Sequence, residues 1–156
     1  MRVHLCVVGR LRGGPEAELV SEYIKRFDRT GRALGLGPAA LAEVEDRKGG
    51  GMAAEAILLR RAVPKGAVIC CLDERGTVEG SPAFAHRLAG WRDAGRSDVA
   101  FVIGGADGLE PGLRTDADHL LSFGKMVWPH MLVRVMLAEQ LYRAASILAG
   151  VPYHRV

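Results

Sequence analysis

Residues Asp118–Arg143 read DHLLSFGKMVWPHMLVRVMLAEQLYR, a short apolar run and a long apolar segment joined by a glycine loop. The run His119–Phe123 predicts a strand, and Met131–Ala149 predicts a helix. The loop Gly124–Trp128 between them ends at Pro129. A surface helix normally carries one apolar stripe, yet this segment is apolar on almost every side. We therefore expect the helix to bury two faces, with a ligand site beside a subunit interface.

The rest of the chain alternates apolar runs with segments of helical periodicity. The other predicted strands are 2–8, 38–44, 67–73 and 97–103, and the other predicted helices are 15–31, 52–63, 83–94 and 111–117. Three of the strands are apolar on both faces, which is typical of a mostly parallel sheet covered by helices on both sides. The sequence therefore predicts one α/β domain over residues 1–156.

Polar segments mark the connections between these elements. Glu45–Gly51 is glycine-rich and charged, which favours a mobile surface connection over a lid. Asp73–Gly76 reads as an acidic turn after a strand. Ser81-Pro82 has the form of a helix N-cap followed by proline at the first helical position.

Composition bounds the compartment and the partners. A net charge of +3 and a pI of about 9.0 give a mild bias toward anionic partners, too weak to establish nucleic-acid binding. Cys6, Cys70 and Cys71 lie in apolar runs with no CxxC or Cys/His metal spacing, so we expect buried, reduced thiols, no metal and a cytoplasmic protein. Neither a signal peptide nor an apolar run long enough for a membrane span is predicted.

Three predicted strand ends have unusual sequences. They are Leu72-Asp73, Gly104-Gly105 and Phe123–Trp128. In an open parallel sheet, ligands bind beyond the carboxyl ends of the strands, and glycines there let a ligand approach the backbone. Apolar neighbours could hold a ring while backbone groups bond its edge. Each glycine alone reads as a turn, but the three ends together predict a site for a small, flat, partly polar cofactor.

Five sequence motifs are similar to those of one known family, and together they cover nearly the whole chain. They are VVGRLR at Val7–Arg12, LDERG at Leu72–Gly76, IGGADGL at Ile103–Leu109, LSFGKMVWPHMLVRVMLAEQLYRA at Leu121–Ala144 and PYHR at Pro152–Arg155. They resemble the RlmH family, knotted SPOUT methyltransferases that act on N3 of a pseudouridine in 23S ribosomal RNA. The departure is Gly35–Ala42, which is less charged than the second strand of family members.

The resemblance implies S-adenosylmethionine as cofactor, a C-terminal trefoil knot and a homodimer. It also implies ribosomal RNA within the assembled ribosome as substrate. It also implies which residues bind the cofactor: Leu72, Gly104, Phe123, Gly124, Lys125, Met126, Val127 and Trp128. These residues lie at the three strand ends already identified.

Methylation of an imide nitrogen benefits from a base or from a cation that stabilises the deprotonated imide. The predicted catalytic residues are Tyr153, His154 and Arg155 in the terminal tail, and His130 at the entry of the long helix. Capping of that helix is an equal alternative for His130, and packing of the tail for Tyr153. Arg134 and Arg143 lie on a mostly apolar helix, where an intersubunit salt bridge competes with a contact to RNA phosphate.

Other functions compete with this one. A knotted methyltransferase acting on transfer RNA shares the chemistry, and a catalytically silent RNA-binding dimer shares the RNA but not the reaction. The sequence argues against a nucleotide-dependent oxidoreductase of Rossmann type, because no GxGxxG follows any predicted strand.

Overall fold

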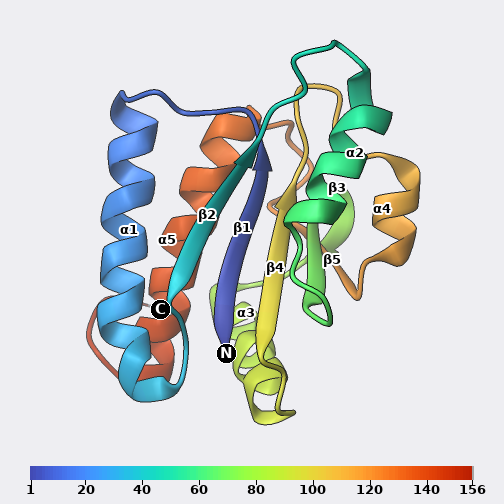
Figure 1. Ribbon diagram of the computed structural model, residues 1–156. Coiled ribbons are helices and arrows are strands. Elements are labelled where there is room, and N and C mark those ends of the chain that lie inside the picture. The colour runs from blue at the N-terminus through green and yellow to red at the C-terminus, as the bar shows by residue number, and fades with distance from the viewer. Residues whose placement is uncertain (156) are drawn as a thin grey trace.

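A computed structural model describes residues 1–155 and shows a five-stranded sheet in which every strand pair is parallel (Figure 1). The strand order is β2-β1-β4-β3-β5. The strands are β1 (Arg2–Val8), β2 (Ala39–Val44), β3 (Val68–Val78), β4 (Asp98–Ile103) and β5 (His119–Ser122). The helices are α1 (Pro15–Gly31), η1 (Arg32–Leu34), α2 (Gly51–Ala62), α3 (Ser81–Asp93), α4 (Pro111–Asp116) and α5 (His130–Ala149).

Helices cover both faces of the sheet, as the unbroken apolar strands predicted. Helices α1, α3 and α5 pack on one face, while α2 and α4 pack on the other (Figure 1). Every residue of β4 is buried, because this strand lies at the centre of the sheet. Cys6, Cys70 and Cys71 are buried and free, which confirms the predicted thiols; burial raises the pKa of Cys6 to about 11.

The helix starts follow from local chemistry, with one correction. Pro15 opens α1, and Glu16 lies in its first turn, where an anion suits the positive end of the helix. Glu110 caps α4 by accepting a hydrogen bond from the Leu113 amide at 3.0 Å. The prediction that Ser81 caps α3 is wrong: Gly80 holds that position, and the Ser81 hydroxyl donates to Gln140 Oε1 on α5 at 2.7 Å.

The predicted acidic turn Asp73–Gly76 is instead part of β3. Leu72 and then Thr77 both pair with Leu121 of β5, so the four residues between them form an irregularity in the ladder. A Cβ built on Gly76 would lie 2.7 Å from the Leu120 backbone, so only glycine fits there. The irregularity places the charged residues of LDERG at the end of the sheet where β5 stops.

Helix α5 is buried on two sides within one chain. It packs against α1 and α3 and also contacts β4, and its residues Leu137, Ala138 and Leu141 are fully buried. Much of the apolar surface that predicted a second subunit is therefore covered by the chain's own helices. Among the helices of residues 1–155, none is long and apolar enough to cross a membrane.

Candidate cofactor and RNA site

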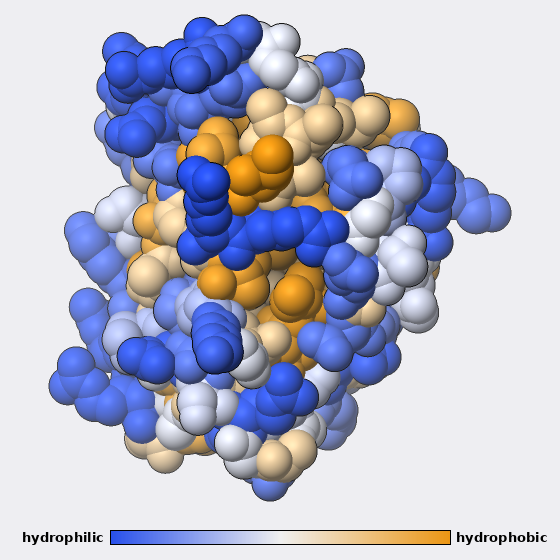
Figure 2. All heavy atoms as spheres, turned by 45° about the vertical axis from the view of Figure 1, so that its right-hand side comes forward, coloured by the Kyte–Doolittle hydropathy of each residue, from blue (hydrophilic) through white to orange (hydrophobic). Residues whose placement is uncertain are grey.

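A hollow of about 430 Å³ lies beyond the carboxyl ends of β4 and β5 and beside the irregular stretch of β3. Its walls come from Leu72–Arg75 of β3, the loop after β4, helix α4, the loop between β5 and α5, and the first turn of α5. On the face turned forward in Figure 2, apolar residues gather centrally, with hydrophilic side chains around them and one hydrophilic stretch running across them. The hollow thus occupies the position where open parallel sheets bind ligands.

Seven of the eight residues expected to bind the cofactor line this hollow. They are Leu72, Gly104, Phe123, Gly124, Met126, Val127 and Trp128. Lys125 is exposed and is absent from the lining. The large side chains of Met126 and Val127 are 72% and 83% exposed, which is unusual for apolar residues and leaves them available to a ligand or a second chain.

His130 is the one predicted catalytic residue that lines the hollow. It is the first residue of α5, and its ring faces Gly9 at the end of β1. Burial, and then the nearby Arg134 guanidinium, lower the pKa of His130 below its ordinary value. His130 therefore presents a neutral imidazole at neutral pH, able to accept or donate a hydrogen bond.

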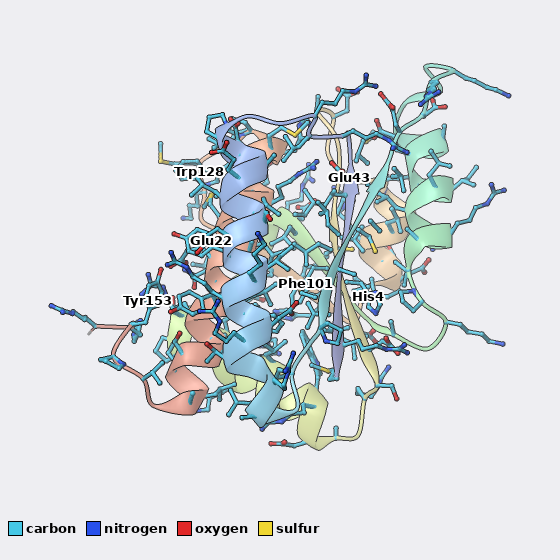
Figure 3. The ribbon with its side chains drawn as sticks, turned by 60° about the vertical axis from the view of Figure 1, so that its left-hand side comes forward. His4, Glu22, Glu43, Phe101, Trp128 and Tyr153 are labelled. Carbon is cyan, nitrogen blue, oxygen red and sulfur yellow. The ribbon has the colours of Figure 1, made fainter. Side chains whose placement is uncertain are left out.

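The tail residues Tyr153, His154 and Arg155 do not line the hollow of their own chain. Figure 3 shows Trp128 and Tyr153 toward opposite ends of α5. The Tyr153 hydroxyl donates to Glu139 Oε1 at 2.9 Å, and the Arg143 guanidinium lies 4.8 Å from the Tyr153 ring centre. The tail is therefore folded back onto the second half of α5.

The contacts of the tail limit its proton chemistry. Burial, and then the hydrogen bond with Glu139, raise the pKa of Tyr153 above its ordinary value, so the phenol stays protonated at neutral pH. His154 Nδ1 lies 3.3 Å from Arg143 Nη1 and accepts from it, since a guanidinium only donates. A neutral His154 in this arrangement carries its proton on Nε2.

Arg134 is fully buried, and the alternatives predicted for it, an intersubunit salt bridge or a phosphate contact, are wrong. Its guanidinium pairs with Glu43 Oε2 of β2 at 2.9 Å within the same chain. It also donates to the carbonyl oxygens of Val8 at 2.9 Å and Gly9 at 3.1 Å. Arg143 likewise has a partner on its own helix, Glu139, at 2.6 Å.

Sequence reasoning missed the charged half of the hollow. The sequence marks Asp73 only as the end of a predicted strand, and Arg75 only as part of the LDERG motif. Both line the hollow, as do Asp107 and Arg114. No sequence pattern indicated that Arg114 belongs to the site, because it lies on a short helix whose contact with β3 is set by the tertiary structure.

Gly104 is needed for a different reason from the one expected. A Cβ at this position would lie 2.6 Å from the Gly108 carbonyl oxygen and 3.0 Å from the Leu109 amide nitrogen. The chain itself, rather than a ligand, therefore makes the close approach to Gly104. A side chain at Gly104 would therefore disturb the packing of the chain's own backbone as well as the hollow.

The Gly104→Val variant should consequently lose stability. Overpacking against backbone atoms costs about 1–3 kcal/mol, and we expect the free energy of unfolding to fall by that amount. Urea denaturation of the variant measures it. Gly90→Val on α3 is the comparison, since a Cβ at Gly90 meets nothing within 4 Å and only helix propensity changes. Equal unfolding midpoints for Gly104→Val and the wild type would contradict the packing argument.

A second hollow, also of about 430 Å³, lies between α1, α3, α5 and β5. Its apolar lining includes Leu19, Tyr23, Val78, Phe84, Val135 and Met136. Leu19 and Val78 are 44% and 64% exposed. Leu121 and Phe123 line both hollows, so the two share a wall.

The chain matches the family model described as "Predicted SPOUT methyltransferase" over residues 1–154. It is 74% identical to the ribosomal RNA large subunit methyltransferase H of Dinoroseobacter shibae, covering 100% of both chains. It is 66% identical to the protein of the same name from Paracoccus denitrificans, covering 99% of both.

Two solved structures share the fold at low sequence identity. A probable methylase family protein from Haemophilus influenzae matches with a TM-score of 0.53 and 13% identity, over 99% of this chain and 70% of that one. A probable methyltransferase from Bordetella pertussis matches with a TM-score of 0.51 and 15% identity, over 92% of this chain and 96% of that one.

Proposed function

Because the chain belongs to the ribosomal RNA large subunit methyltransferase H family of SPOUT methyltransferases, we propose that it methylates 23S ribosomal RNA with S-adenosylmethionine. The target is N3 of a pseudouridine, on the assembled ribosome in the cytoplasm. One observation carries the proposal: residues from the irregular stretch of β3 and from the ends of β4 and β5 converge on one hollow at the carboxyl edge of the sheet. The trefoil knot that accompanies this family stays a prediction for this chain.

The residues of the hollow fit S-adenosylmethionine. Its volume lies in the range of small-molecule sites. Apolar side chains such as Met126, Trp128 and Val133 suit an adenine ring, while Asp73 and Arg114 supply charge for a polar arm. Among residues 1–155, no group of histidine, cysteine, aspartate and glutamate side chains is arranged to hold a metal ion.

When bound, S-adenosylmethionine supplies a methyl group on a sulfonium, which a nucleophile displaces in line. The chain's contribution is to hold the reacting groups in contact and keep water away, and such alignment can supply much of the rate. The highly exposed Val127 lies at the rim where an RNA base would enter. Neutral His130 in the wall can accept a proton from the imide or donate to its oxygen.

The tail acts at the imide, where N3 must lose its proton before or during transfer. His154 Nε2–H can donate to a carbonyl oxygen of the imide and stabilise the anion, and Arg155 can pair with a phosphate. Since the tail lies away from the hollow of its own chain, we propose that it serves the hollow of a second copy. Tyr153, anchored on Glu139, sets the position of His154 beside it.

A homodimer is therefore part of the proposal. The second apolar hollow, with the exposed Leu19 and Val78 in its lining, is the surface we assign to the partner copy. We expect sedimentation at micromolar concentration to give the mass of two chains. Leu19→Glu should shift the boundary toward one chain, whereas Ile57→Glu on the opposite face should not. A wild-type monomer that still methylates RNA would contradict the shared site.

The function is tested with ribosomes from cells that lack this protein. Incubation with the purified chain and S-adenosylmethionine should add one methyl to one pseudouridine of 23S RNA, detected by mass spectrometry of nuclease fragments. Free ribosomal RNA and transfer RNA are the parallel substrates. Methylation of transfer RNA alone would replace the ribosomal proposal, and tight RNA binding without transfer would indicate a silent binding protein.

A further inference from the structure

Two arginines share one carboxylate at the charged end of the hollow. The Asp73 side chain is only 6% exposed, and its two oxygens face Arg75 Nη1 at 3.5 Å and Arg114 Nη1 at 3.4 Å. The Arg75 amide also donates to Asp73 Oδ1 at 2.9 Å, which fixes the carboxylate at the bend of β3. One negative charge thus holds two guanidinium groups against the hollow, and the trio keeps a net charge of +1.

The guanidinium groups of Arg75 and Arg114 have spare donors. Each can donate five hydrogen bonds, yet within residues 1–155 Arg114 makes one long bond and the Arg75 side chain makes none. The comparison with Arg134 is instructive, because three acceptors surround that buried guanidinium. Arg114 is also largely withdrawn from solvent, its side chain being 23% exposed. A partly buried guanidinium with unused donors favours a planar anion as ligand.

The hollow is divided by chemistry. The loop between β5 and α5 supplies an apolar side with Met126, Val127 and Trp128. The irregular stretch of β3 and helix α4 supply the arginines. Glu74 and Asp107 line the hollow as well, so negative groups are present beside the positive pair. A ligand that matches both sides has a flat apolar body and an arm carrying one positive and one negative group.

We propose that Arg114 and Arg75, held by Asp73, bind the carboxylate of the amino-acid arm of S-adenosylmethionine, while Asp107 and Glu74 face its ammonium group. This assignment rests on the proposed function and extends it to the amino-acid end of the cofactor. It gives the hollow a direction, with the adenine on the side of Trp128 and the amino acid on the side of α4.

The test compares two ligands that differ by one carboxylate. Calorimetry with S-adenosylmethionine and with decarboxylated S-adenosylmethionine should show the second binding the wild type roughly tenfold or more weakly, the effect of losing a charge-assisted hydrogen bond. Arg114→Gln should weaken the binding of S-adenosylmethionine by a similar factor and leave the affinity for the decarboxylated ligand unchanged. Arg75→Gln, at a side chain 64% exposed, should act in the same direction without affecting folding.

Arg61→Gln is the matched control, because Arg61 is an exposed arginine on α2 outside the lining of the hollow. It should bind both ligands as the wild type does. Equal weakening of both ligands by Arg114→Gln and Arg75→Gln would overturn the assignment and indicate distortion of the hollow. Unchanged cofactor binding with weakened binding of ribosomal RNA would overturn it in favour of a phosphate contact. A wild-type chain that binds neither ligand would instead refute the proposed function.

Discussion

Replacing Arg134 with methionine is expected to lower the free energy of unfolding by roughly 3 kcal/mol. The buried guanidinium joins three elements, since it bonds the carbonyl oxygens at the end of β1, Glu43 on β2 and, through its own backbone, α5. Methionine fills similar space but leaves the buried Val8 carbonyl without its side-chain donor. The Glu43 side chain is 23% exposed, so water can hydrate its carboxylate once Arg134 is gone. The loss of stability is therefore smaller than for a fully buried ion pair.

Two measurements accompany that variant. Glu43 Oε2 accepts hydrogen bonds from Arg134 and, at 2.7 Å, from the Leu11 amide. Glu43→Gln keeps an oxygen for both donors, so in urea denaturation it should lower the free energy of unfolding clearly less than Arg134→Met does. NMR titration should show a higher pKa for His130 in Arg134→Met, because one of the two influences that lower it is removed. Unfolding midpoints equal to the wild type would mean that this guanidinium does not anchor α5.

The sheet was predictable because its information is local. Unbroken apolar runs such as 97–103 have the length and composition of buried parallel strands, and proline and glycine mark the ends of the intervening helices. The structure confirms that alternation. The prediction of an acidic turn after Leu72 was wrong. Asp73–Gly76 has the composition of a turn, but whether it belongs to β3 depends on pairing with β5, which is distant in the sequence.

The candidate site was predictable where glycines and apolar residues gather at strand ends, and unpredictable where charges pair across the chain. Arg134 shows the limit. An arginine on an apolar helix needs a partner, but the sequence does not tell which of many carboxylates it meets, and Glu43 lies far away in the chain. Arg114 meets Asp73 in the same way, through the packing of α4 against β3.

Deleting residues 153–156 should reduce methyl transfer to ribosomes by at least ~100-fold, the scale of losing an acid–base group. Affinity for S-adenosylmethionine should stay within a few-fold of the wild type, since the residues assigned to the cofactor lie at the strand ends and α4. Single-turnover assays and calorimetry measure the two quantities separately. Methylation at the normal rate by the shortened chain would refute the catalytic role of the tail.

His154→Ala separates two ways in which the tail can act. If His154 removes the imide proton, its loss should be relieved at raised pH, where the imide ionises unaided. If it only donates from Nε2 or positions the base, as its contact with Arg143 favours, the activity should stay low across the same pH range. Tyr153→Phe is the companion variant, because it removes the bond to Glu139 and keeps the ring against Tyr142, 4.4 Å away between centres.

Mixing two inactive variants tests whether the tail serves its own chain or a partner. One variant lacks residues 153–156 and keeps an open hollow; the other is Ala106→Trp, which fills the hollow from its exposed rim and keeps the tail. If the tail of one copy completes the hollow of the other, a mixed dimer contains one whole site and methylation returns. If the tail worked within its own chain, neither subunit would hold both parts, and the mixture would stay inactive. We expect recovery, because the tail lies folded on α5 outside the lining of its own hollow, near the surface assigned to the partner.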